Sequence, residues 1–187
     1  MTNVRNTWLA LGAVALAQTA VLADLVIDRV RLVTTGREVV LPIVPVDPRD
    51  LLKGDYVRLS FDISRLPTSL LGSAPAPKAD VPFYVTLEKK ADGSWGAVKV
   101  TPRFPHDAGP DRVALKGRLQ LGSWSDSYIW PRYGIESYFV PQGQGLQLEA
   151  LAREKKLAVL VAVDKAGEAA IKGLIIDGKL QYEEPLF

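Results

Sequence analysis

The stretch VDPRDLLKGDYVRLSF, residues 46–61, reads as a helical turn that stops abruptly and starts a strand. Asp47 is a suitable N-cap, and Pro48 suits the first helical position, where its missing N–H costs nothing. Asp50 lies in the first turn, where negative charge is favourable. Gly54 can adopt the positive φ that ends a helix. We therefore predict structural roles for these four residues.

A strand is predicted directly after the turn. From residue 56 to residue 63 the hydrophobic pattern has period two, which is typical of a half-buried strand. The apolar face has Val57, Leu59, Phe61 and Ile63, and the other face has Tyr56, Arg58, Ser60 and Asp62. Because Tyr56 and Arg58 lie opposite the apolar face, we expect both side chains to point away from the core.

The same segment resembles the signature of the GDYXXLXY family. The matching residues are Gly54, Asp55 and Tyr56, followed by Leu59, and Phe61 occupies the position of the final tyrosine. Members of this family look like membrane-anchored proteins with a single span. The resemblance implies no established activity, cofactor or catalytic residue.

A second block, YGIESYFVPQG at residues 133–143, also resembles a recurring part of that family. Both blocks mix large aromatic side chains with charged ones, and tyrosine and arginine are enriched at binding hot spots. We predict that the two blocks share one binding surface. Its candidate residues are Asp55, Tyr56, Arg58, Tyr133, Glu136 and Tyr138.

The N-terminal segment has the length and composition of a membrane anchor. Residues 7–23 carry no charge, and extension to Ile27 adds only Asp24. As a helix, this segment would be about 30 Å long, close to one hydrocarbon thickness. A cleaved signal peptide, with small residues at 21–23, and a buried soluble helix are the alternatives.

The flanking charges predict the orientation of this anchor. Arg5 and the free amine precede the segment, whereas Asp24 and Asp28 come at its far end, before Arg29. The positive-inside bias therefore places the N-terminus in the cytoplasm and the remainder outside. We expect a single-pass protein of the cytoplasmic (inner) membrane with a periplasmic C-terminal domain.

The remainder of the chain predicts a mainly β fold. We assign residues 1–32 to the anchor and residues 33–187 to one mostly antiparallel β domain, barrel-like or sandwich-like, with one short helix at 146–156. The two prolines in residues 38–46 favour an edge strand. Asp92-Gly93 and Asp177-Gly178 are hairpin signals. Further strands are predicted at 81–87, 95–100, 113–121, 135–140, 158–163, 169–176 and 179–182.

Composition excludes several function classes. The net charge of +2 is too small to indicate nucleic-acid binding, and the absence of cysteine removes thiolate chemistry. His106 is the only histidine, so no multi-histidine zinc site is expected, and no other cofactor is indicated. A dyad of Lys53 with a serine lacks any sign of a desolvated lysine. An enzyme is therefore not favoured.

The sequence favours a membrane-anchored binding or assembly module. Membrane lipid around the N-terminal helix and an integral membrane protein are the expected partners. The alternatives are a membrane-anchored hydrolase that uses carboxylates, and a cell-wall carbohydrate-binding domain that uses the aromatic residues between Trp124 and Phe139.

Overall fold

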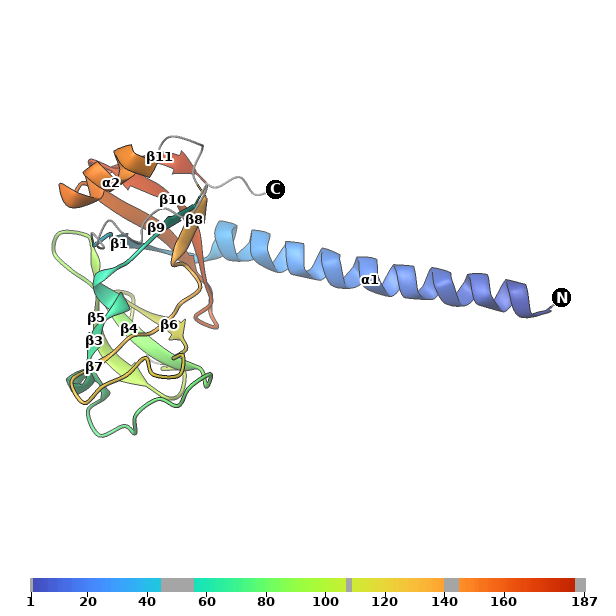
Figure 1. Ribbon diagram of the computed structural model, residues 1–187, viewed down its shortest axis with the longest axis horizontal. Coiled ribbons are helices and arrows are strands. Elements are labelled where there is room, and N and C mark those ends of the chain that lie inside the picture. Colours follow the sequence, from blue (N-terminus) through green and yellow to red (C-terminus); the bar gives the residue numbers. More distant parts are fainter. Residues whose placement is uncertain (1, 45–55, 107–108, 140–144, 184–187) are drawn as a thin grey trace.

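A long helix leads into a β domain (Figure 1). The computed structural model describes residues 2–44, 56–106, 109–139 and 145–183. The elements are α1 (Thr2–Thr35), β1 (Arg37–Pro42), β2 (Tyr56–Arg58), η2 (Asp62–Ser64), β3 (Leu66–Pro67), η3 (Thr68–Leu71), β4 (Phe83–Lys89), β5 (Trp95–Thr101), β6 (Arg112–Gly117), β7 (Tyr128–Ile129), β8 (Ser137–Phe139), α2 (Gly145–Arg153), β9 (Leu157–Val163), β10 (Ala169–Ile176) and β11 (Lys179–Glu183).

Helix α1 projects from the domain as an isolated rod (Figure 1). Its segment Asn6–Thr35 is long and apolar enough to span a membrane, and its most apolar part is not buried against the protein. Trp8 and Leu16 are 70% and 73% exposed. An uncovered apolar helix of this length is suited to a lipid environment. The predicted helix is thus confirmed, and it continues eight residues beyond Ile27, to Thr35.

One residue, Gly36, separates α1 from β1. Its N–H donates to the Leu32 carbonyl, at 3.0 Å. A β-carbon at this position would overlap the Leu32 carbonyl oxygen, and it would lie 3.0 Å from the Ala162 β-carbon and 3.1 Å from the Val163 nitrogen. The C-terminal end of α1 packs against β9 and β10, and Val33 is buried there. The helix and the sheet therefore meet without a linker.

The first sheet has four antiparallel strands in the order β1-β9-β10-β11. β1 is an edge strand that ends at Pro42, as predicted from the prolines in residues 38–46. β9 is almost wholly buried at the centre of the sheet. Asp177 and Gly178, with φ values of 49° and 75°, form the tight turn between β10 and β11. Two successive positive φ values match the hairpin turn expected from this dipeptide.

The second sheet has the order β5-β4-β6, also antiparallel. Its β4–β5 hairpin turns at Asp92-Gly93, as predicted. The Asp92 carboxylate accepts a hydrogen bond from the Ser94 N–H at 2.9 Å, and Gly93 has a φ of 82°. The side chain of Asp92 thereby stabilises a turn that the glycine makes sterically accessible.

The two sheets contribute to a single hydrophobic core. Val39 and Val161 from the first sheet and Val85 and Leu115 from the second have no exposed surface. Helix α2 packs against β9 through the buried Leu148 and Ala152. The described strands do not close into a barrel, so the domain is sandwich-like.

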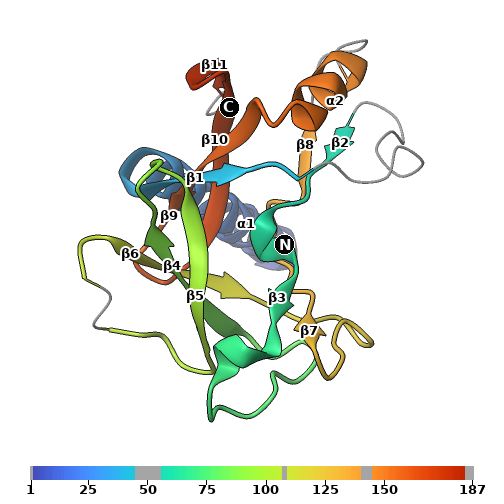
Figure 2. The same ribbon diagram turned by 90° about the vertical axis from the view of Figure 1, so that its left-hand side faces the viewer.

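A broken antiparallel ladder joins residues 56–68 to residues 126–139. β2 pairs with β8, and β3 pairs with β7. Between these pairs, the Leu59 N–H donates to the Glu136 carbonyl at 2.8 Å. Figure 2 shows the two segments running side by side along one flank of the domain.

The predicted strand at 56–63 is too long. β2 ends at Arg58, and the short 3₁₀ helix η2 begins at Asp62. The Phe61 N–H donates to the Ser64 hydroxyl at 3.0 Å, and this local bond favours a turn over a ladder. The predicted burial pattern still holds over the described side chains: Leu59, Phe61 and Ile63 are buried, whereas Asp62 is exposed.

Candidate functional site

The two blocks predicted to share a surface are neighbours in the backbone. Tyr56 pairs with Phe139, and Arg58 pairs with Ser137. The structure describes only the backbone of Tyr56 and Arg58. The other predicted residues of the first block, namely Asp47, Pro48, Asp50, Lys53, Gly54 and Asp55, lie outside the described residues.

Glu136 stabilises the turn that precedes β8. Its carboxylate accepts hydrogen bonds from the Tyr133 N–H at 2.5 Å and from the Gly134 N–H at 3.1 Å. Gly134 has a φ of 82°, a conformation that favours glycine. Since two backbone donors occupy this carboxylate, Glu136 acts here as a cap for the turn.

Tyr133 ties the second block to the first through the core. It is 6% exposed, and its hydroxyl donates to the Ile63 carbonyl at 2.8 Å. Burial, and secondarily the negative charge of Glu136, raise the pKa of the Tyr133 hydroxyl well above its ordinary value of about 10. The hydroxyl is therefore a neutral hydrogen-bond donor at physiological pH.

The candidate aromatic residues divide between core and surface. Tyr133 and Tyr138 lie in the core, whereas Trp124 and Trp130 are 48% and 40% exposed. Tyr128 is half-buried. Among the candidate aromatic side chains that the structure describes, the exposed and half-buried ones thus lie before Tyr133 in the chain.

Three side chains form what we call the outer row: Tyr128, Trp130 and Arg132. They alternate with the buried Ile129, Pro131 and Tyr133. The Tyr128 and Trp130 rings are 6.4 Å apart between centroids, and the Arg65 guanidinium lies 3.7 Å from the Tyr128 centroid. This cation–π contact extends the outer row onto residues 56–68.

Sequence reasoning missed Arg65 because this residue follows η2, which interrupts the predicted strand. Beyond that interruption the period-two pattern no longer indicates which side chains are buried. The alternation from Tyr128 to Tyr133 is visible in the sequence, but no strand is predicted between residues 121 and 135. Only the pairing of β3 with β7 brings Arg65 to Tyr128.

The remaining predicted sites show no catalytic arrangement in the described part of the chain. His106 is exposed and packs edge-on against Phe104, with ring centroids 5.5 Å apart. No group of three His, Asp or Glu side chains suited to a metal occurs among the described residues.

Comparison with known proteins identifies the family. A family model described as "GDYXXLXY protein" matches residues 18–174, from within α1 to within β10. No curated protein and no solved structure shows significant similarity. The matched region contains both neighbouring blocks, the outer row and most of both sheets. Because the match covers most of its length, the chain belongs to the GDYXXLXY family.

Proposed function

We propose that this protein is a membrane-anchored binding module, with its β domain outside the cytoplasm and an integral membrane protein as its partner. The observation that carries the proposal is the junction at Gly36. A helix suited to a membrane runs into an edge strand without a linker, and the C-terminal end of this helix packs on the same sheet. Such a junction holds the domain at the membrane surface in one orientation.

The outer row is the binding surface in this proposal. β3 and β7 lie on the side of the domain away from α1 in both views (Figures 1 and 2). The row presents Tyr128, Trp130 and Arg132, with Arg65 beside them. Aromatic and arginine side chains are the types that dominate binding hot spots. β2, which begins at Tyr56 of the family signature, belongs to the same broken ladder as β3 and β7. In the proposal, Tyr56 and Arg58 therefore extend the binding surface.

The hydrolase alternative has no comparable support. The Glu136 carboxylate, the candidate acid in the described part of the chain, is already hydrogen-bonded to two backbone N–H groups. General acid–base catalysis needs a group within reach of the substrate proton. We therefore retain the binding module as the proposed function.

The orientation is tested with single cysteines in the otherwise cysteine-free chain. Ala91→Cys lies in the exposed β4–β5 turn, and Thr2→Cys precedes the span. In cells with a permeabilised outer envelope, an impermeant maleimide is expected to label Ala91→Cys at once. It should label Thr2→Cys only after lysis of the inner membrane, because Arg5 holds that end inside. The reverse labelling order would contradict the orientation.

The partner is tested by replacing Trp130 with a photo-crosslinking amino acid in the full chain. We expect one discrete adduct with an integral membrane protein, because Trp130 is central to the outer row. Val98 on β5, 43% exposed against 40% for Trp130, is a control of matched exposure. Equal adducts from both positions would contradict a specific surface. Adducts with glycan instead of protein would favour the carbohydrate-binding alternative.

A further inference from the structure

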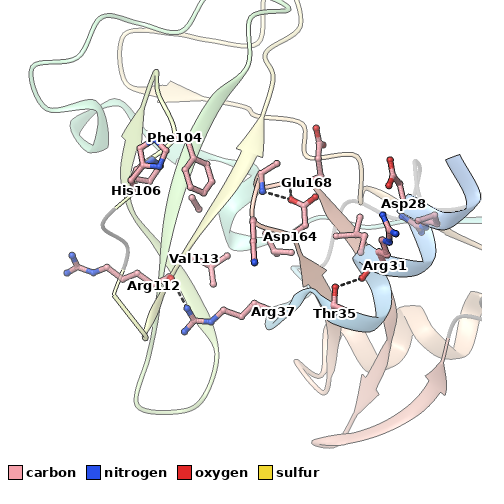
Figure 3. Close-up of a pocket in the computed structure, with 17 residues that line it drawn as sticks. Asp28, Arg31, Thr35, Arg37, Phe104, His106, Arg112, Val113, Asp164 and Glu168 are labelled. Atoms are coloured by element: carbon pink, nitrogen blue, oxygen red, sulfur yellow. Dashed lines mark hydrogen bonds between the residues drawn. The ribbon is translucent and has the colours of Figure 1, made fainter. Parts of the chain in front are cut away.

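A groove lies where α1 meets the β domain. Its volume is about 970 Å³. The C-terminal end of α1 forms one wall. The start of β6, the β9–β10 turn and the loop around Phe104 form the remainder (Figure 3). The groove thus combines residues from the membrane helix with residues from both sheets.

The depth of the groove relative to the bilayer follows from helix geometry. If residues 7–27 fill the hydrocarbon layer, Asp28 begins the next layer and Thr35 lies about 10 Å further along the axis, at about 1.5 Å per residue. Lipid headgroups occupy roughly the first 5–8 Å beyond the hydrocarbon. The wall that α1 contributes, from Asp28 to Thr35, therefore lies at the level of the headgroups and just above it.

The lining of the groove has an excess of positive charge. Among the described lining residues, the cations are Arg29, Arg31, Arg37, Arg112 and Lys165. The carboxylates are Asp28, Asp164 and Glu168. Two of these acids are already engaged: Asp164 accepts the Ala166 and Glu168 N–H groups, at 2.8 and 2.9 Å, and Glu168 pairs with Lys116.

Two cations remain available for a ligand. Arg112 pairs with Glu88 at 2.7 Å. Arg37 donates to the Arg112 carbonyl at 3.0 Å (Figure 3). Within the described ranges, the exposed Arg31 and Lys165 side chains make neither an ion pair nor a hydrogen bond. They approach the groove from two different walls, α1 and the β9–β10 turn.

The groove is also amphipathic. Leu32, Val113 and Val163 line it beside the cations. Below it, α1 presents uncovered apolar side chains, such as Leu25, which is 63% exposed. A ligand with a negative headgroup and alkyl chains would match both regions, because its chains can continue along α1.

We propose that this groove binds the phosphate of an anionic phospholipid in the leaflet that faces the domain. Arg31 and Lys165 contact the phosphate, and the acyl chains lie along α1. The proposal rests on the membrane anchorage in the proposed function, and it is independent of which leaflet the domain faces.

The test uses the purified full-length chain in detergent micelles and native mass spectrometry with phosphatidylglycerol or phosphatidylcholine as the probe. The wild type is expected to retain phosphatidylglycerol preferentially. Arg31→Gln combined with Lys165→Gln should weaken its retention about 30-fold, since each cation near a lipid surface contributes about 1 kcal/mol. The matched control is Lys99→Gln with Lys179→Gln, which removes two exposed charges outside the groove and should leave retention unchanged.

The outcomes separate this inference from the proposed function. Equal retention of the two lipids, or equal losses of retention in both double variants, would overturn the proposal that the groove binds an anionic phospholipid. If inorganic phosphate binds and displaces phosphatidylglycerol at equal concentration, the site takes a free anion and the lipid proposal is wrong. Both proposals fail if the wild-type chain does not sediment with membranes. If the chain sediments with membranes but shows no lipid preference, only the lipid-binding proposal is contradicted.

Discussion

Replacement of Gly36 by valine is expected to lower the free energy of unfolding by about 3 kcal/mol, one of the two largest effects we predict. A β-carbon there overlaps the Leu32 carbonyl and crowds the β9 backbone at Val163. Neither neighbour is a flexible side chain that can move aside, so the α1–β1 junction must shift. Overpacking of this kind costs about 1–3 kcal/mol, and the branched side chain places the change at the upper end.

The measurement is urea unfolding of the full chain in detergent micelles, followed by tryptophan fluorescence. Gly36→Ala should give a smaller loss in the same direction, since it adds only the β-carbon. Gly109→Ala is the control, because a β-carbon there meets open space and Gly109 does not have a positive φ. A Gly36→Val midpoint equal to that of the wild type would show that the junction is looser than described.

Tyr133→Phe is expected to destabilise the protein by about 1–3 kcal/mol at neutral pH. The substitution removes the donor to the buried Ile63 carbonyl and leaves that acceptor unsatisfied. It keeps the ring and therefore the packing of the core. Tyr84→Phe is the matched control, because the Tyr84 hydroxyl makes no hydrogen bond within the described residues, and its effect should stay within about 0.5 kcal/mol.

The difference in stability between the wild type and Tyr133→Phe is also expected to depend on pH in the alkaline range. The pKa of Tyr133 is raised in the folded state, first by burial and then by Glu136. Above pH 10 the unfolded chain releases this proton while the folded chain keeps it, so the stabilisation present at lower pH is lost as the pH rises. At pH 11 the advantage of the wild type over Tyr133→Phe should shrink by about 1.4 kcal/mol. A difference that stays constant from pH 8 to pH 11 would contradict the buried hydroxyl.

Much of the fold can be predicted from local patterns in this sequence. The alternation in β4, the turn dipeptides at Asp92 and Asp177, and Pro42 at the end of β1 each act through backbone geometry within a few residues. The apolar run at 158–163 predicted a strand, and it forms most of β9, an inner strand of the first sheet. These features depend on steric preferences that need no distant partner.

The candidate site was less predictable, because its side chains depend on pairing between distant segments. Tyr133 and Tyr138 are core residues, although their aromatic and charged neighbourhood suggested a surface. The reason is that the ladder to residues 56–68 turns them inward. The contact of Arg65 with Tyr128 and the cationic groove likewise exist only after the chain has folded back on itself.

The pairing of β1 with β9 has a consequence for the order of folding. Arg37, next to the helix, pairs with Val163, near the other end of the chain. At about 5–20 residues per second, synthesis of the intervening chain takes roughly 6–25 s. During this delay β1, with its apolar Val39 and Leu41, has emerged but has no partner strand. Folding of a sheet with such distant pairing is intrinsically slow. The edge nearest the helix is therefore the first part of the domain to be made and among the last to be completed.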